Sequence, residues 1–301
     1  MMTMAAFFQK PLAHLPSHRL FVLVMAALLG AFLFSSGLAD NQGSVDRSLL
    51  QMEAVKPRLD LTPELAASVA RAANQNGVSG VSDLQPVLEQ AASLSFNSAE
   101  MESRIASNLA KTGQVNVNAS ELAKAAHALS EARKASKNGG GETSLEPVDA
   151  ERRSQISELL NTMASPELAV ETAVTEQIMY AALEVVTNAS AEQLAIAPIE
   201  NLQAQTGATI QNLRARTTNE NPTPKHAAKA QERERLALAL EALTSDELAV
   251  LTRFYASEEG QAKRDTLIST YRDVSNAANA KLLNTYLERL ITQSKNKSQQ
   301  N

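Results

Sequence analysis

The stretch from Leu240 to Gln261 constrains the fold of this chain most, because its local signals define where helices start and end. Thr244 is followed three residues later by Glu247. This spacing predicts a capping box, in which each side chain accepts a hydrogen bond from the backbone amide of the other residue. The apolar side chains that follow recur at helical spacing: Leu248, Val250, Leu251, Phe254 and Tyr255. A helix that begins at Thr244 therefore has a wide apolar face that must pack against other helices.

A second helix is expected directly after the first. Ser257 can cap it, and the two glutamates that follow suit the positive end of the helix dipole. Gly260 lies near the start of this helix, where glycine costs about 1 kcal/mol relative to alanine. We therefore expect a close contact that only glycine allows, between the new helix and the Phe254 and Tyr255 end of the preceding one.

The same stretch resembles the core motif of a bacterial family labelled domain of unknown function 2059, a helical domain found mostly in exported proteins of Gram-negative bacteria. The residues that carry the resemblance are Leu243, Thr244, Glu247, Leu248, Phe254, Tyr255, Ser257, Gly260 and Gln261. Glu258 stands where the family has proline, and both residues suit the first helical position. A weaker similarity, in the leucine pattern around Leu159 and Leu160, extends back to residue 150. The resemblance implies a helical fold and export, with these residues as a structural or groove-lining motif, and it implies no activity.

The composition of the chain favours helices. Apolar residues make up 44% of the 301 positions, but aromatic residues only 4%, so that alanine and leucine dominate. Strands draw on β-branched and aromatic residues, and no stretch alternates apolar and polar positions for long. The sequence therefore predicts an all-α protein, in which amphipathic helices pack as a bundle.

Charge and cysteine content exclude several classes of function. The net charge is −5 and no run of lysine and arginine occurs, so we expect no nucleic-acid partner. The chain has no cysteine, which rules out disulfides, thiol nucleophiles, cysteine-ligated zinc and a lipoprotein anchor.

The first 39 residues have the layout of a secretory signal. A basic segment precedes an apolar run from Leu20 to Phe34, and small residues follow up to Ala39. We expect cleavage after Ala39 and a periplasmic protein. The alternative is an uncleaved inner-membrane anchor through residues 20–39, which would leave the rest of the chain facing the periplasm.

The sequence suggests two helical subdomains after this segment. Three consecutive glycines, Gly139 to Gly141, are typical of a flexible linker, which we place at 139–148. We expect an N-terminal helical region over 40–138 and a C-terminal helical domain, which carries the family resemblance, over 149–293. The polar residues 294–301 are expected to be disordered.

Residues that could support chemistry are sparse. His127 and His226 have no helical partner that would complete a metal site, and no nucleophile elbow, phosphate loop or dinucleotide motif occurs. Pairs of carboxylates, such as Glu258 and Glu259, lie in first helical turns, where they complement the dipole. We therefore expect no enzyme, and no catalytic, cofactor-binding or metal-binding residue.

Three functions remain open from the sequence. The first is a non-catalytic helical module that binds an unknown envelope protein through an apolar groove or helix face. The second is a periplasmic carrier of a lipid or other apolar small molecule. The third, a hydrolase, has the least support, because the sequence shows no cluster of acid, base and nucleophile.

Overall fold

The computed structural model describes residues 41–137, 149–187, 208, 210–212 and 224–300. Within these ranges the chain forms helices joined by turns, and no residue lies in a strand. The all-α bundle predicted from the sequence is confirmed. The predicted signal or anchor segment 1–39, including the possible membrane attachment 20–39, and the linker 139–148 lie outside the described residues.

The helices fall into two groups along the chain. The N-terminal group consists of α2 (Asn41–Met52), α3 (Val55–Leu61), the 3₁₀ turn η2 (Thr62–Glu64), α4 (Leu65–Gln75), α5 (Val81–Ser95), α6 (Ser98–Leu109) and α7 (Ala119–Lys137). The C-terminal group consists of α8 (Ala150–Thr162), α9 (Ser165–Thr187), α12 (Pro224–Glu241), α13 (Ser245–Ala256) and α14 (Glu258–Gln300). None of the described helices combines the length and apolarity needed to cross a bilayer.

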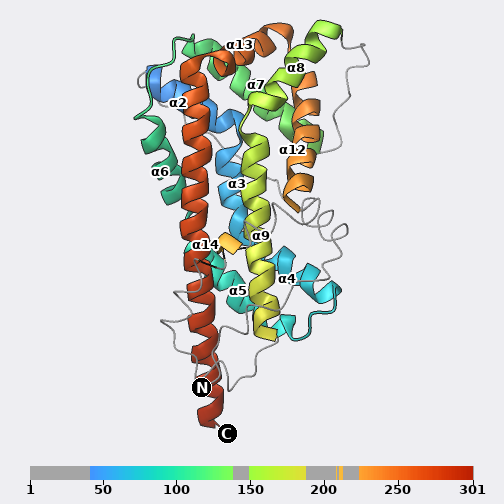
Figure 1. Ribbon diagram of the computed structural model, residues 1–301, viewed down its shortest axis with the longest axis vertical. Helices are drawn as coiled ribbons and strands as arrows, with labels where there is room; N and C mark the ends of the chain where they lie inside the picture. Colours follow the sequence, from blue (N-terminus) through green and yellow to red (C-terminus); the bar gives the residue numbers. More distant parts are fainter. Residues whose placement is uncertain (1–40, 138–148, 188–207, 209, 213–223, 301) are drawn as a thin grey trace.

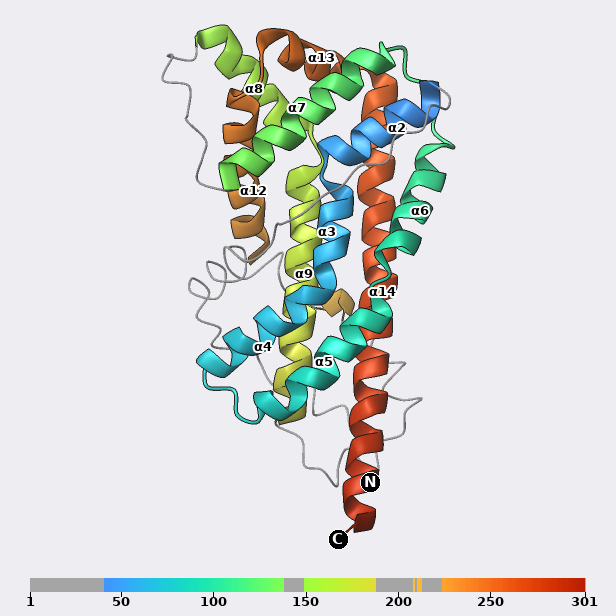
Figure 2. The same cartoon turned by 180° about the vertical axis from the view of Figure 1, so that it is seen from behind.

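Two long helices, α9 and α14, run side by side along the long axis of the molecule (Figure 1). Helices α2, α7, α8 and α13 gather at one end, while α4 and α5 lie toward the other end (Figure 2). Helix α12 packs along α9. The long pair therefore provides the surface against which α4, α5, α6 and α12 pack.

One hydrophobic core runs through both groups of helices. Its buried members extend from Val45 to Leu290 and come from helices on both sides of the predicted linker. Helix α14 packs on α5 and α6, and α13 and α12 pack on α7. The two regions that we expected to be separate subdomains thus share one core, because the short N-terminal helices find their apolar partners on the C-terminal ones.

Helix α14 is longer than the sequence suggested. It runs through 43 residues to Gln300, so most of the tail expected to be disordered continues the helix. No glycine or proline follows Gly260, and nothing in the sequence stops the helix once it has started.

Candidate functional site

The capping box predicted at the start of α13 is present. The Thr244 hydroxyl accepts a hydrogen bond from the Glu247 amide at 3.3 Å, and the Glu247 carboxylate accepts one from the Thr244 amide at 2.7 Å. Leu248, one position further on, is fully buried. These residues fix the start and the orientation of α13.

The tight corner between α13 and α14 explains why residue 260 is a glycine. The Ser257 Oγ donates to the Phe254 carbonyl at 2.7 Å and accepts from the Gly260 amide at 3.0 Å. A Cβ on Gly260 would lie 1.9 Å from the Phe254 carbonyl oxygen. The close contact expected from the sequence is therefore confirmed. Gln261 is exposed, and its amide donates to the Ser257 carbonyl at 3.0 Å.

The two aromatic residues of the motif belong to the hydrophobic core. The rings of Phe254 and Tyr255 meet edge to face, with centroids 5.0 Å apart, and both side chains are buried. The Tyr255 hydroxyl donates to the carboxylate of Glu53, which lies between α2 and α3. Burial, together with the Glu53 charge, raises the pKa of Tyr255 well above its ordinary value. Tyr255 thus joins the C-terminal motif to the N-terminal helices.

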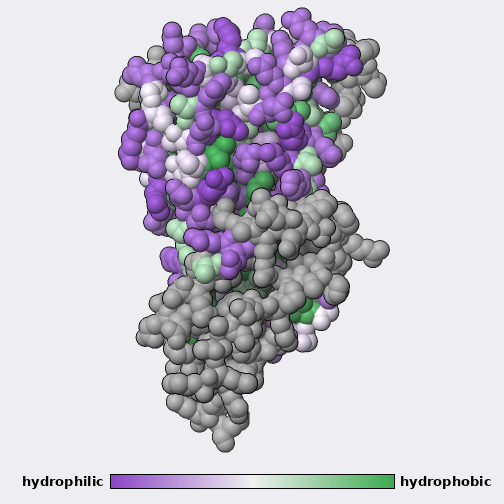
Figure 3. Space-filling view, in the orientation of Figure 1, coloured by the Kyte–Doolittle hydropathy of each residue, from purple (hydrophilic) through white to green (hydrophobic). Residues whose placement is uncertain are grey.

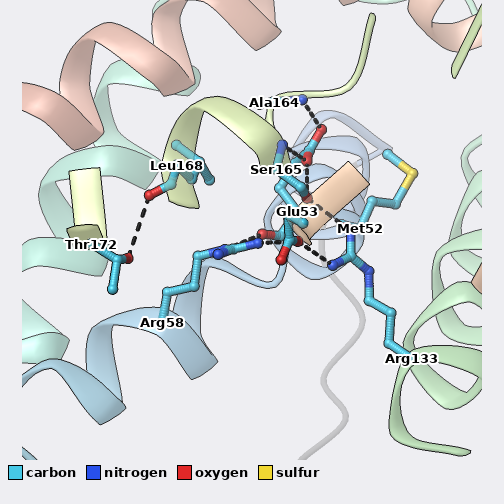
Figure 4. A network of polar contacts seen from close by, with 9 residues as sticks. Met52, Glu53, Arg58, Arg133, Ala164, Ser165, Leu168 and Thr172 are labelled. Carbon is cyan, nitrogen blue, oxygen red and sulfur yellow. Dashed lines mark hydrogen bonds and ion pairs between the residues drawn. The ribbon is translucent and has the colours of Figure 1, made fainter. Parts of the chain in front are cut away.

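Glu53 caps the start of α9, although the two are far apart in the sequence. Its carboxylate accepts hydrogen bonds from the Ala164 amide at 2.8 Å, and from the Ser165 amide and hydroxyl at 2.6 Å each (Figure 4). A carboxylate at a helix N-terminus also complements the helix dipole. The next residue, Ala54, has a φ of 51°, which alanine rarely adopts. This strained turn aims Glu53, which has no exposed surface, at α9.

Two arginines complete the network around Glu53. Arg133 of α7 donates to the Ser165 hydroxyl at 2.8 Å, to the Met52 carbonyl at 3.1 Å and to the Glu232 carboxylate at 3.0 Å. Arg58 of α3 also donates to Glu232. Burial acts to raise the pKa of Glu232, but the two guanidinium groups outweigh it and hold that pKa below its ordinary value.

We call this group the joint cluster and define it as Glu53, Arg58, Arg133, Ser165, Glu232 and Tyr255. Its two carboxylates and two guanidinium groups balance in charge, and they connect α3, α7, α9, α12 and α13 with the α2–α3 joint. No local sequence pattern predicts these contacts, because the partners are far apart in the sequence. The cluster holds these helices in place relative to one another, since each member forms a hydrogen bond or an ion pair with another member.

The buried charge of Lys263 was also not predicted from the sequence. Lys263 of α14 has no exposed surface, and its Nζ donates to the Leu109 carbonyl at 3.0 Å and to the Thr112 hydroxyl at 3.1 Å. The same Nζ forms an ion pair with Asp46 of α2 at 2.7 Å. Lys263 therefore ties the first turns of α14 to α2 and to the end of α6.

A half-open pocket of about 110 Å³ lies where the corner between α5 and α6 meets α14. Ser95 and Met101 line it from the side of α5 and α6, and Val274 and Ala278 line it from α14. Arg104 and Lys281 stand at its rim. None of its lining residues belongs to the 243–261 motif, and sequence patterns alone did not reveal the pocket.

Metal binding finds no support in the described part of the chain, where no three His, Asp or Glu side chains lie close enough to hold an ion. Comparisons with protein-family models, curated proteins and solved structures gave no match. Membership of the family that the 243–261 motif resembles thus stays a prediction, although the motif residues have the structural roles described above.

Proposed function

We propose that the protein is an exported helical module of the bacterial cell envelope, which acts by binding a partner and carries out no catalysis. The observation that carries this proposal is that charged side chains at the contacts between helices hold those helices together. Glu53, Arg133, Glu232 and Lys263 are all bonded between helices, and none of them is left to act on a substrate.

Export is supported by the first 39 residues and by the family resemblance. The basic segment, apolar run and small residues of this stretch are typical of a signal that directs a chain out of the cytoplasm. We propose a periplasmic location, with inner-membrane attachment through residues 20–39 as the alternative. Sequencing the N-terminus of the mature protein distinguishes the two, because cleavage removes the apolar run.

The surface favours a partner held by mixed polar and apolar contacts. On the face shown in Figure 3, the described part is mainly hydrophilic, with small separate hydrophobic areas. Leu94 and Leu238 are large apolar residues that are 49% and 48% exposed. Reversible protein interfaces have this mixed character.

Photo-crosslinking in cells tests the proposal. A photoreactive amino acid at position 94 or 238 is expected to trap one recurrent envelope protein, while the same residue at the exposed position Lys124 serves as the control. The absence of any adduct at native abundance, or a cytoplasmic partner, would contradict the proposal. The pocket that α5, α6 and α14 line has a volume of about 110 Å³, which is small beside the roughly 300 Å³ or more of typical small-molecule sites, so this pocket gives no support to a carried lipid.

A further inference from the structure

The pocket between α5, α6 and α14 has an electropositive rim. Asn97 caps α6, and its side chain accepts from the Glu100 amide at 3.2 Å, so the start of this 12-residue helix borders the pocket. Arg104 lies one turn further along α6, and Lys281 lies on α14. Because both cations line the same pocket, an anion bound in it would interact with both.

These cations are available to a ligand. Among the described residues, neither Arg104 nor Lys281 takes part in an ion pair or a side-chain hydrogen bond, and both side chains are exposed. Glu100, at the same rim, lies outside ion-pair distance of either and offsets one of the two positive charges. The rim therefore keeps a net charge of +1, with a carboxylate that competes with any bound anion.

The floor of the pocket is apolar except for one hydroxyl. Met101, Val274 and Ala278 are buried there. Ser95 is 6% exposed, and its Oγ has no hydrogen-bond partner. A buried hydroxyl without a partner is destabilising. A ligand in the pocket that carries an acceptor could take a hydrogen bond from the Ser95 hydroxyl and remove this cost.

We propose that this pocket binds a carboxylate group carried on a short apolar stem. The carboxylate would lie between Arg104 and Lys281, and the stem would cover Val274 and Ala278. A phosphate fits less well, because it has no apolar part to cover the floor. The inference rests on the proposed function, since the stem and carboxylate are those of a glutamate side chain of the partner or of a free short-chain acid.

Titration with butyrate, followed by NMR of the methyl groups of Met101, Val274 and Ala278, tests the site. We expect saturable shifts confined to these methyl groups. Acetate, which lacks the stem, and inorganic phosphate are expected to bind more weakly, and the neutral analogue butyramide is expected to give no shift. Butyramide shifts equal to those of butyrate would overturn the role of the charge.

Variants of the rim residues provide the decisive comparison. The double variant Arg104→Ala/Lys281→Ala is expected to weaken butyrate binding about tenfold, because two charge-assisted contacts are lost. Arg71→Ala/Lys124→Ala removes the same charge from exposed positions on α4 and α7 and should leave binding unchanged. Glu100→Gln should tighten binding, because it removes the competing carboxylate.

The two sources of the carboxylate are separated by a capped tetrapeptide with a central glutamate. Tighter binding of this peptide than of butyrate indicates a protein side chain, and equal or weaker binding indicates a free short-chain acid. No saturable shift with butyrate, or equal affinity in the wild type and Arg104→Ala/Lys281→Ala, overturns the proposed site. If the site fails these binding tests and the crosslinked partner is still trapped in cells, the proposed function stands while this inference fails.

Discussion

The Tyr255 hydroxyl donates a hydrogen bond to the carboxylate of Glu53, a residue 202 positions earlier in the chain. Both side chains are almost completely buried, at 1% and 0% exposure. Through this contact the C-terminal motif and the strained joint after α2 hold each other in place. The motif residues that the resemblance singled out therefore serve the packing of the whole bundle.

Loss of the Tyr255 hydroxyl is expected to destabilise the fold. Tyr255→Phe should lower the free energy of unfolding by about 1–3 kcal/mol, since the Glu53 carboxylate loses a donor without access to water. Glu53→Gln should cost about 3–5 kcal/mol, because it breaks a buried charge network and places an amide NH₂ among hydrogen-bond donors. Urea denaturation of both single variants and the double variant measures these losses.

The double variant separates coupling from simple loss. Because Tyr255 and Glu53 are in contact, its destabilisation should be smaller than the sum of the two single effects. Glu64→Gln, at an exposed position, is the matched control and should change stability little. Strict additivity of the Tyr255 and Glu53 effects would mean that the hydrogen bond contributes nothing.

Gly260→Ala is expected to cost about 3 kcal/mol, because the new methyl group would overlap the Phe254 carbonyl oxygen and force the helix corner apart. Gly43→Ala is the control, since Gly43 lies in α2 with open space where a methyl group would stand, and its replacement should stabilise by about 1 kcal/mol. Thermal melts of the two variants should thus shift in opposite directions. An unchanged melt for Gly260→Ala would show that the corner can relax.

Lys263→Met is expected to destabilise the protein by about 3–5 kcal/mol, since it leaves the buried carboxylate of Asp46 without its cation. Adding Asp46→Asn should restore part of this loss, because it removes the uncompensated charge. The free energies of unfolding of the single and double variants provide the measurement. Lys124→Met, at an exposed position on α7, should have little effect.

Glu176 of α9 should make stability depend on pH near neutrality. Burial raises its pKa to about 7 from 4.5, and its Oε1 has no hydrogen-bond partner. The folded state therefore favours the neutral acid, so that stability is complete below pH 4.5 and falls as the pH rises to 7. A shift of this size corresponds to about 3 kcal/mol.

Glu176→Gln tests this dependence, because the amide stays neutral at every pH. The variant should be more stable than the wild type at pH 8 and similar to it at pH 4.5, as measured by urea midpoints. Glu158→Gln, at an exposed position on α8, should follow the wild-type curve. Parallel curves for Glu176→Gln and the wild type would refute the raised pKa.

Local features of the fold could be predicted from the sequence, and long-range ones could not. The roles of Thr244, Ser257 and Gly260 depend on neighbours within a few positions, so the spacing of these residues in the sequence predicts their roles. By contrast, Glu53 binds a helix start 112 positions away, and Lys263 binds a carbonyl 154 positions away. No short sequence pattern predicts contacts between residues so far apart.

The division into two subdomains shows the same limit. A run of glycines indicates a break in regular structure, but it does not reveal whether the helices on either side share a core. Here the apolar face of α5 meets α14, across the predicted linker. Likewise, polarity alone predicts disorder for the tail of α14, although a helix already started needs only the absence of a breaker to continue.

The pairing of α14 with α5 and α6 sets the order in which the bundle can be completed. Helices α5 and α6 bury against a partner that begins only at Glu258, so a nascent chain cannot close this core before α14 has been synthesised. Until α14 is present the chain stays open, which is the state that the export proposed above would require. The core of the bundle then closes when α14 packs against α5 and α6.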